Sequence, residues 1–470
     1  MLSLETVDYQ HIYRRKIKQS QEGFHWTTKY GFQYGLPTAA IVPSTPKPDL
    51  SPTYDVIIIG AGFAGLTAAR DLSFRGKKTL LIEARDRIGG RCWTVPTGPD
   101  TQVEMGGTWV HWQQPHVFSE LQQYGMDEFE ETVAGGEDCE VVFFDVDGQG
   151  GRSVIPFPFN LEASVKQNAE YLDVDKLSIE DRVAQLDGLT QEEKAMLKAH
   201  LASFYGVPLE KTSFMEVLRV HALCNFDPGM MEPATMKYKL AEGTTAFALA
   251  ILEEYKGDRI FGSPVSSIKQ SDGEFPVSVT LKNGDRYSSE AVISTVPINV
   301  ISSIVFDPPL SALRQEAFSS GVTPARTDKL LVYTPTKLNN GLNIACEGDM
   351  PYASSFTDGI HGNHTLLTLL AHPDISLDRS DENIRLVETL RPAGVTVDSA
   401  YGHLWSDDPY AGGVMPVRGP GFLEKYHEEI RKPHGRVYFC GSDFADGWRG
   451  FISGAFEDAY RVTREVLKAC

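Results

Sequence analysis

VIIIGAGFAG, at residues 56–65, is the stretch of sequence that decides the fold. Four consecutive β-branched residues are typical of a buried strand in a parallel sheet, and the segment 66–72 after the glycines has the composition of a helix. In the turn between them, Gly60 permits the tight bend, Gly62 lets the backbone approach a diphosphate, and Gly65 allows close packing of helix on strand. The diphosphate would face the helix N-terminus, so the sequence predicts a dinucleotide-binding site.

An acidic residue downstream supports this prediction. The apolar run 79–82 predicts a second parallel strand, which closes a βαβ unit, and Glu83 follows it, 18 residues after Gly65. A carboxylate at this position can accept hydrogen bonds from the ribose hydroxyls of the dinucleotide. A GxGxxG motif alone could be a structural turn, but the strand before it and Glu83 after it favour binding.

A basic loop with two glycines follows at residues 84–91. Arg85 and Arg91 could reach phosphate oxygens, and Gly89-Gly90 would let the chain pass close to a bound cofactor. Taken alone, arginines of this kind are more often found in surface ion pairs. The loop therefore gains its meaning from the glycine turn that precedes it.

The rest of the chain predicts further elements of both kinds. Residues 178–181 and 190–193 have the form of capped helix starts, and the second leads into a helix that ends near Gly206, which predicts a helical cap. Apolar patterns predict strands at 277–281, 291–297 and 437–441 and a last helix at 454–468. Dinucleotide-type segments thus recur at the start, middle and end, so we expect an α/β protein whose domains are discontinuous.

Length and composition exclude several classes of protein. At 470 residues the chain is long enough for about two domains. Its net charge of -19, from 44 basic and 63 acidic residues, argues against nucleic acid as a partner. No apolar run reaches the length of a signal peptide core or the ~18 residues of a membrane span, so we expect a soluble, cytoplasmic protein. The six cysteines are scattered without metal-ligand spacing, so we expect free thiols and no metal site.

Several motifs together resemble the flavin amine oxidases, most closely the fungal monoamine oxidases. They are GAGFAGL at 60–66, EARDRIGGR at 83–91, EMGGTWVHW at 104–112, STVP at 294–297 and GWRGFI at 447–452. The resemblance covers residues 54–468. It implies a Rossmann-like FAD-binding domain of the glutathione-reductase or hydroxybenzoate-hydroxylase type, interleaved with a substrate-binding domain of mixed sheet and helices.

The resemblance also implies domain boundaries and cofactor contacts. Residues 54–110, 235–300 and 426–470 would form the FAD-binding domain, and 111–234 and 301–425 the substrate-binding domain with its helical cap. Residues 1–53 lie outside the resemblance; their polar, proline-rich composition predicts an N-terminal extension that wraps the body or is partly disordered. The implied contacts with non-covalent FAD are Gly60, Gly62, Ala64, Gly65, Glu83, Ala84, Arg85, Gly90, Arg91, Gly106, Gly107, Thr108, Trp109, Val265, Gly441, Asp443, Phe451 and Ile452.

Individual roles follow from the same resemblance. Glu83 would bind the adenosine ribose and Arg91 would lie near the phosphates. The backbone of Val265 would hold the adenine. Asp443 would lie near the ribityl chain. Residues 106–108 would run beside the isoalloxazine ring.

The implied catalytic residues are Lys329, Trp109, Met415 and Phe451. Lys329 resembles the lysine that holds a water against flavin N5, although a lysine at the start of an apolar strand is often a surface residue. Covalently flavinylated relatives carry a cysteine where this chain has Val414, so the FAD is expected to be non-covalent. Relatives place a second aromatic residue opposite Phe451, where this chain has Met415. A flexible methionine there would suit a longer aliphatic amine, or it is an ordinary core residue.

The implied reaction is oxidation of a primary amine to an imine by hydride transfer to the flavin, with O2 reduced to H2O2. A homodimer is a further implication. Alternatives within the fold are a polyamine oxidase, a desaturase of the phytoene type, or an amino-acid oxidase, whose substrate carboxylate Arg326 or Arg449 would bind. A monooxygenase would need a second dinucleotide fingerprint, which we do not find. A non-catalytic flavoprotein scaffold is the alternative of a different class.

Overall fold

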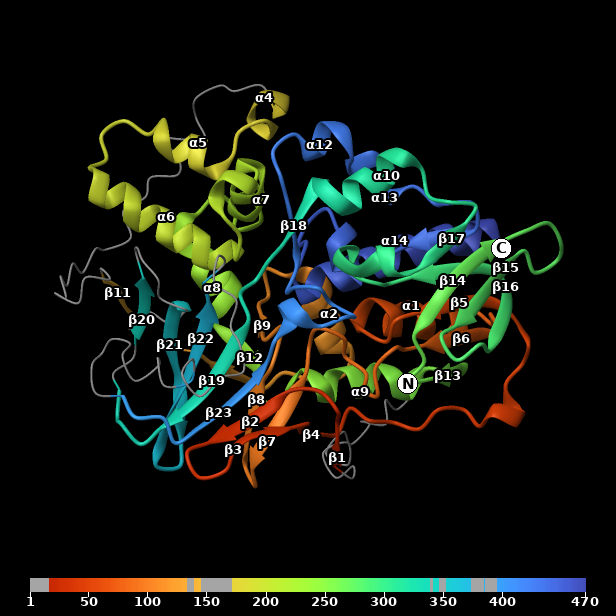
Figure 1. Ribbon diagram of the computed structural model, residues 1–470, viewed down its shortest axis with the longest axis horizontal. Helices are drawn as coiled ribbons and strands as arrows, with labels where there is room; N and C mark the ends of the chain where they lie inside the picture. The colour runs from red at the N-terminus through yellow and green to blue at the C-terminus, as the bar shows by residue number, and fades with distance from the viewer. Residues whose placement is uncertain are drawn as a thin grey trace, which may run out of the picture.

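The computed structural model describes residues 17–132, 139–144, 171–338, 341–345, 352–372, 384 and 395–470. Two eight-stranded sheets organise these residues, one on each side of the molecule as drawn in Figure 1. The helical cap lies at the upper left of this view, above the second sheet.

The first sheet contains the predicted βαβ unit. Its hydrogen-bonded order is β13 (Asp258–Ile260), β6 (Thr79–Ile82), β5 (Thr53–Ile59), β16 (Arg286–Ser294), β15 (Val277–Leu281), β14 (Val265–Gln270) and β17 (Val305–Asp307), and β25 (Val437–Phe439) also pairs with β16. β13, β6, β5, β16 and β25 run parallel. The predicted strands are therefore confirmed, except that the strand expected at 291–297 begins earlier and ends at Ser294, and the strand expected at 437–441 ends at Phe439.

Three helices pack against one another beside this sheet: α1 (Phe63–Phe74), α9 (Thr244–Glu254) and α14 (Ile452–Ala469). The rings of Phe63, Phe247 and Phe456, one from each helix, have centroids 5.0 to 5.4 Å apart and are buried. Because segments from the start, middle and end of the chain meet in one apolar cluster, this half of the molecule is discontinuous in sequence.

The second sheet contains strands from the N-terminal extension. Its order is β11 (Glu140–Phe144), β20 (Gly341–Ala345), β21 (Tyr352–His361), β22 (His364–Ala371), β19 (Lys329–Thr334), β23 (Ser399–His403), β2 (Phe24–Thr27) and β3 (Gly31–Tyr34). Phe24 and Trp26 of β2 are buried at alternate positions, as a strand with one face on a core requires. The described part of the extension is therefore an integral part of the sheet.

The helical cap contains α4 (Tyr171–Asp175), α5 (Ile179–Ala184), α6 (Gln191–Tyr205), α7 (Phe214–Leu223) and α8 (Met231–Met236). Both predicted capping boxes are confirmed: Ser178 and Thr190 each accept the amide three residues later. Gly206 ends α6 in the left-handed conformation, with φ +66°. Ser203 of α6 bonds Ser354 of β21 through their hydroxyls at 2.7 Å, which fixes the cap on the second sheet.

Smaller elements connect these parts. They are the pairs β1 (Lys18–Gln19) with β4 (Pro37–Thr38), β7 (Thr94–Gly98) with β8 (Thr101–Glu104) and β18 (Val322–Pro324) with β24 (Pro416–Arg418), the sheet β10 (Phe129–Glu131), β12 (Tyr238–Leu240) and β9 (Trp109–Val110), and the helices α2 (Pro115–Gln123), α10 (Ala312–Glu316), α12 (Phe422–Lys425) and α13 (His427–Arg431).

Two segments lie across the expected domain boundaries. β17 pairs with β14 in the first sheet, although it lies beyond the boundary expected at residue 300. Val117 and Leu121 place α2 in the core formed by α1, α9 and α14, although α2 lies beyond the boundary expected at residue 110. Sequence pattern alone could not assign either segment, since both depend on contacts with distant parts of the chain. The rest of the expected division stays a prediction.

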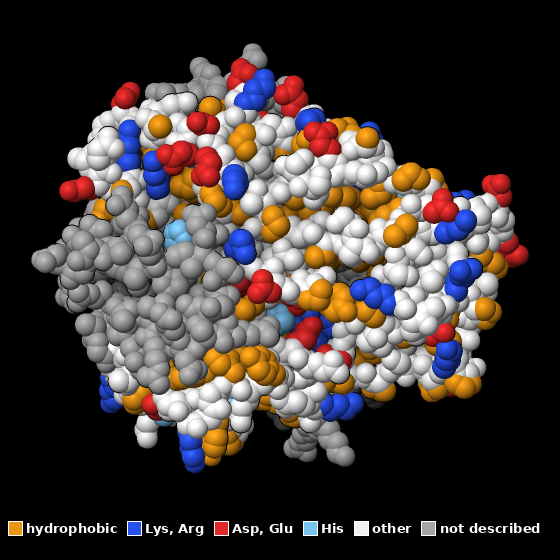
Figure 2. Space-filling view, viewed as in Figure 1, with side chains coloured by type: hydrophobic (Ala, Val, Ile, Leu, Met, Phe, Trp, Pro, Cys, Tyr) orange, Lys and Arg blue, Asp and Glu red, His pale blue; other side chains and the backbone are white. Residues whose placement is uncertain are grey.

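The surface and the helices give two further observations. On the face shown in Figure 2, acidic and basic side chains are interspersed. In the part of the chain that the structure describes, no helix has both the length and the apolar composition needed to cross a bilayer. Cys92, Cys139, Cys224, Cys440 and Cys470 are free thiols.

Candidate functional site

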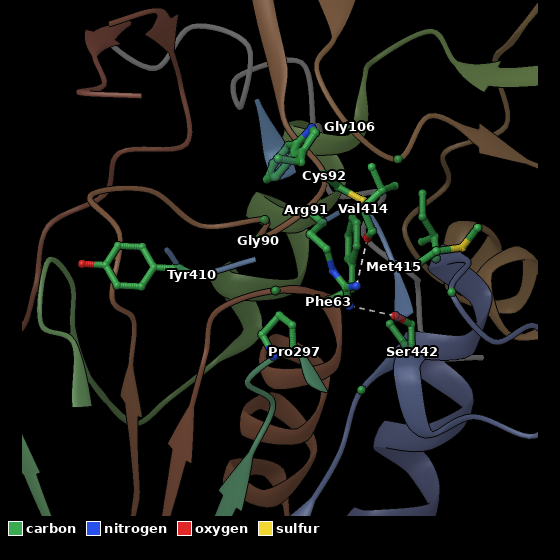
Figure 3. Close-up of a pocket in the computed structure, with 18 of the residues that line it drawn as sticks. Phe63, Gly90, Arg91, Cys92, Gly106, Pro297, Tyr410, Val414, Met415 and Ser442 are labelled. Atoms are coloured by element: carbon green, nitrogen blue, oxygen red, sulfur yellow. Dashed lines mark hydrogen bonds between the residues drawn. The ribbon is translucent and has the colours of Figure 1, made fainter. Parts of the chain in front are cut away.

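A cavity of about 470 Å³ extends from the glycine turn to the helical cap. Eighteen of its lining residues are drawn in Figure 3. Most of the residues predicted from the sequence line it: Gly60, Gly62, Ala64, Glu83, Ala84, Arg85, Gly90, Arg91, Gly106, Gly107, Thr108, Trp109, Val265, Lys329, Met415, Gly441, Phe451 and Ile452. The tertiary structure thus brings one continuous surface together from many separate segments.

The glycine turn forms one end of the cavity. Gly60 has φ +105°, a backbone conformation that is unfavourable for any residue with a side chain. A Cβ at this position would also lie 2.3 Å from Thr295 Oγ1. Gly62 is the N-cap of α1 and offers no side-chain cap, so the first amides of the helix remain available to a ligand. These amides and the helix dipole together favour an anion.

Gly65 does not line the cavity. A Cβ at Gly65 would lie 1.9 Å from the carbonyl oxygen of Gly60, so its role is the close packing of α1 on the turn. The expected cofactor contact of Gly65 is therefore replaced by a structural one, although the sequence argument for close packing is confirmed.

Glu83 lies at the end of β6 and is buried. Its carboxylate accepts hydrogen bonds from the amides of Ala61, at 2.6 Å, and Arg85, at 2.8 Å. Burial raises the pKa of Glu83. The two amides hold the carboxylate beside the glycine turn, where its remaining lone pairs can meet ribose hydroxyls.

Arg85 lines the cavity, but its guanidinium group is already paired. It forms a bidentate ion pair with Asp408, at 2.6 and 2.8 Å, and a second pair with Glu22. Arg87 also binds Glu22, at 2.8 Å, and His403 binds Asp408, at 2.7 Å. We call these five residues the N-terminal clamp, because Glu22 ties the N-terminal extension to the loop after β6. Because most of its donors are engaged in these ion pairs, the expected contact of Arg85 with phosphate stays a prediction.

The clamp also contains a possible ligand set for a metal ion. Glu22, His403 and Asp408 have ligand atoms within 4.8 Å of one another. Both carboxylates are already neutralised by the guanidinium groups of Arg85 and Arg87, which would repel a cation. We therefore interpret this cluster as an ion-pair network.

Asp443 lies one layer behind the cavity wall. Its carboxylate accepts from Arg91, at 2.6 Å, and from the amide of Ile298, at 3.0 Å. Figure 3 shows Arg91 bonded to the carbonyl of Val414 and the hydroxyl of Ser442. Asp443 therefore orients Arg91 from behind the cavity wall, and its expected place near the cofactor stays a prediction.

Lys329 is buried at the start of β19. Its ammonium group donates to Thr108 Oγ1 at 2.6 Å, to the carbonyl of Gly106 at 2.7 Å and to that of Glu104 at 3.3 Å. It also lies 4.9 Å from the centre of the Trp109 ring. Burial lowers the pKa of Lys329 to about 8. Lys329 thus brings a positive charge to the turn 106–108, while the water-holding role expected for it stays a prediction.

The far end of the cavity is largely apolar. Met415 lines it and lies against Gly450, where an added Cβ would meet Met415 Sδ at 2.8 Å. Phe451 follows directly and packs edge-on against Trp448, with ring centroids 5.1 Å apart. Sequence analysis missed the remaining lining here: His200, Ser203, Phe204, Thr235, Met236, Thr327, Leu342, Ile344, Ser354 and Leu370. They come from α6, α8, β20, β21, β22 and the segment just before β19, and they belong to no local motif.

Other missed residues line the cavity nearer the glycine turn. They are Thr295, Pro297, Trp405 and Tyr410. The STVP motif marked the first two as part of the resemblance without a role. Trp405 donates its indole N–H to the carbonyl of Met105 at 2.9 Å, which ties the loop after β23 to the turn 104–108.

The two arginines considered for a substrate carboxylate do not line the cavity. Arg326 is exposed, and buried Arg449 is bonded to Glu216 at 2.5 Å. Among the described residues at the apolar end, Lys329 is the cation that lines the cavity, and its three donors are occupied. The geometry therefore gives no support to an amino-acid oxidase.

The cavity fits the expected FAD. Gly62 leaves its backbone open, since an added Cβ would meet only Gly90 Cα at 3.8 Å and the carbonyl oxygen of Gly89 at 3.9 Å. The amides at the start of α1 would hold the diphosphate. Glu83 would hold the adenosine ribose, and the cavity wall at Val265 would hold the adenine. The turn 106–108 and Ile452 would then hold the ring beside the apolar end. Val414 offers no thiol for a covalent bond.

Comparison with known proteins points to the same family as the sequence motifs do. A sequence model described as flavin containing amine oxidoreductase matches residues 63–467. A pseudooxynicotine dehydrogenase from a Pseudomonas species is 34% identical over 439 residues, which cover 88% of this chain and 86% of the relative. The (S)-6-hydroxynicotine oxidase of Paenarthrobacter nicotinovorans is 27% identical over 437 residues, covering 88% and 99%.

A solved structure is also similar. A putrescine oxidase bound to putrescine superposes with a TM-score of 0.74 at 21% identity, over 88% of this chain and 99% of that one. At this identity the likeness shows the fold. A likeness to fungal enzymes in particular stays a prediction.

Proposed function

This chain belongs to the family of flavin-containing amine oxidoreductases, and on that premise we propose that it oxidises a primary amine to an imine and passes the electrons to O2. The protein is an FAD-dependent amine oxidoreductase. The observation that carries the proposal is a single cavity with a diphosphate-binding turn at one end and an apolar wall with Met415 and Phe451 at the other.

The protein itself mainly positions the amine and excludes its charged ammonium form. FAD supplies the hydride acceptor when it is bound. The apolar wall disfavours the ammonium form of the substrate, so the amine binds with the lone pair that C–H cleavage requires. Since burial alone can achieve this deprotonation, no dedicated general base is needed. The imine would leave the cavity and hydrolyse to a carbonyl compound and ammonia.

The substrate class follows from the width and polarity of the apolar end. Phe204, Met236, Leu342, Ile344 and Leu370 give it an aliphatic and aromatic lining. With methionine in place of a second aromatic wall, an elongated chain can lie beside the cofactor. We favour a long-chain aliphatic amine, such as a sphingoid-like metabolite or an amine-bearing fungal toxin, over a small arylalkylamine.

An amine panel tests the proposal. The purified yellow protein should be bleached anaerobically by at least one long-chain primary amine, and admission of air should restore the colour with release of H2O2. A protein that keeps its colour with every amine would be a non-catalytic flavoprotein. Bleaching by secondary amines alone would exclude a primary amine as the substrate.

The electron acceptor needs its own experiment, because the 34% identical relative is called a dehydrogenase. In a dehydrogenase, an acceptor other than O2 reoxidises the cofactor. If recolouring in air-saturated buffer is as fast as turnover, the oxidase proposal stands. Recolouring far slower than turnover with an artificial acceptor would favour a dehydrogenase.

A Met415→Trp variant is expected to change substrate preference. The indole would restore an aromatic wall near Phe451 and narrow the apolar end, so kcat/KM for benzylamine should rise relative to a long-chain amine by about tenfold or more. Steady-state kinetics with both amines measures the ratio. Leu313→Trp, on the exposed surface of α10 and away from the cavity wall, controls for a general effect of an added indole. An unchanged ratio in Met415→Trp would count against this role.

A Lys329→Met variant is expected to slow reoxidation of the reduced cofactor at least tenfold, because it removes the buried positive charge that would stabilise the negative charge developing on O2 as it accepts electrons. With a pKa of about 8, Lys329 carries this charge below pH 8 and loses it as the pH rises. Wild-type reoxidation should therefore slow above pH 8. Stopped-flow absorbance against pH measures it, and equal pH profiles for both proteins would refute the role.

A further inference from the structure

A second cavity, of about 480 Å³, lies between α7 and the segments that carry α12 and α13, in the upper part of Figure 1. None of its lining residues lines the cofactor cavity. Three guanidinium groups reach it, those of Arg219, Arg418 and Arg449. We call it the three-arginine pocket.

One buried carboxylate serves two of these arginines. Glu216 accepts from Arg449 at 2.5 Å and from Arg219 at 2.9 Å. Although burial raises it, the guanidinium groups of Arg449, Arg219 and Arg418 bring the pKa of Glu216 down to about 2. Glu216 is therefore a permanent anion, but its single charge is shared between two cations.

Arg418 is left without an acidic partner. It is 2% exposed, and no carboxylate of the described residues lies within ion-pair distance of it. One of its terminal nitrogens donates to His427 Nδ1 at 3.0 Å, and the other, Nη2, has no hydrogen-bond partner. The cation also lies over the Phe422 ring, 4.8 Å from its centre. A buried guanidinium with a free donor is costly unless an anion meets it.

The other acidic residues of the pocket are already engaged. Asp446 pairs with Arg431 and, at 3.3 Å, with His427. Asp175 accepts the amides of Leu423 and Glu424 through Oδ2, at 2.9 and 3.2 Å, and caps α12. Its Oδ1 is buried without a partner, and burial raises the pKa of Asp175. A ligand that can donate a proton would satisfy that oxygen too.

We propose that the three-arginine pocket binds a small oxyanion, a phosphate or carboxylate group, with Arg418 and Arg219 as its donors. Arg219 contributes a second free donor, since its Nε is buried without a partner. Guanidinium groups present parallel N–H donors that match two oxygens of one anion. Ala222 and Phe226, both exposed, line the mouth.

Calorimetric titration of the FAD-loaded enzyme tests the proposal. Inorganic phosphate and acetate are added separately at constant ionic strength in chloride, with the cofactor site filled so that it cannot bind phosphate. We expect saturable binding of one anion per chain and a rise in Tm at saturation. Binding of phosphate alone, of acetate alone or of both would support the site and identify the group it takes.

Arg418→Gln is the main variant. It should weaken binding at least tenfold and, since it removes an uncompensated buried charge, should not lower Tm in chloride. Arg219→Gln, which leaves Arg418 in place, should also weaken binding and serves if Arg418→Gln does not fold. Arg75→Gln, at an exposed end of α1, removes the same charge far away and should bind as the wild type does. Absence of saturable binding by the wild type, or unchanged affinity in both pocket variants, would overturn the proposal.

Discussion

Gly65→Ala is expected to yield a protein that unfolds readily and is recovered colourless. The added methyl group would lie 1.9 Å from the carbonyl oxygen of Gly60, which belongs to the backbone of the cofactor turn and cannot move away alone. Forced overpacking of this kind costs about 1–3 kcal/mol or more. The ~1 kcal/mol that alanine gains over glycine in a helix does not offset it. Thermal unfolding of the apoprotein measures the loss.

Gly62→Ala provides a matched comparison within the same turn. Its φ of -76° suits alanine, and its nearest new contact would be Gly90 Cα at an ordinary 3.8 Å. The apoprotein should therefore be as stable as the wild type, while the methyl group fills the space that the diphosphate approaches. We expect FAD affinity, measured by quenching of flavin fluorescence, to fall at least tenfold. A Gly62→Ala variant that binds FAD normally would contradict the placement of the diphosphate at this turn.

Glu22→Ala is expected to have the second largest effect, through the N-terminal clamp. Removal of this carboxylate leaves the buried guanidinium groups of Arg85 and Arg87 with only Asp408 as counter-ion. Breaking a buried pair by removing one partner costs about 3–5 kcal/mol. Because Arg85 lines the cofactor cavity, the loop after β6 should loosen and FAD should dissociate at a lower temperature than in the wild type.

A second ion pair of the same segment is the control. Lys47 binds Asp285 at 2.7 Å on the surface, where solvent screens the interaction. Lys47→Ala should leave both the unfolding midpoint and the temperature of FAD release unchanged. If Glu22→Ala matched Lys47→Ala in both measurements, the clamp would have no energetic role. Partial recovery in Glu22→Gln with Arg87→Met would show that the uncompensated charge, rather than the lost contact, is the cause.

Local patterns predicted the parts of the fold and site that depend on neighbouring residues. The glycine turn, Glu83 and both capping boxes are set by spacings of a few residues to about twenty, and the structure has all of them where expected. The resemblance added Lys329 and Met415, whose places in the cavity no local pattern could give.

Contacts between distant segments were beyond such patterns. Arg85 resembles a phosphate ligand in its own loop, but its partners come from 63 residues before it and 323 residues after it. Asp443 was expected at the cofactor because its loop is there, whereas its side chain turns to Arg91. Sequence analysis did not predict β2 and β3. Each strand has only four residues in a polar segment, which is too short to show a clear alternation of apolar and polar positions.

The pairing of β2 with β23 has a consequence for synthesis on the ribosome. Residues 24–27 emerge early and can pair at once with residues 31–34, but they find their other neighbour only when residues 399–402 have been made. β16 can likewise pair early with β5 and β15, but its pairing with β25 waits for residues 437–439. With both sheets closed by their last-made strands, neither half can mature while the nascent chain is still short. We therefore expect chaperones to hold the early segments, and premature termination near the C-terminus to leave aggregation-prone edges rather than a shorter working enzyme.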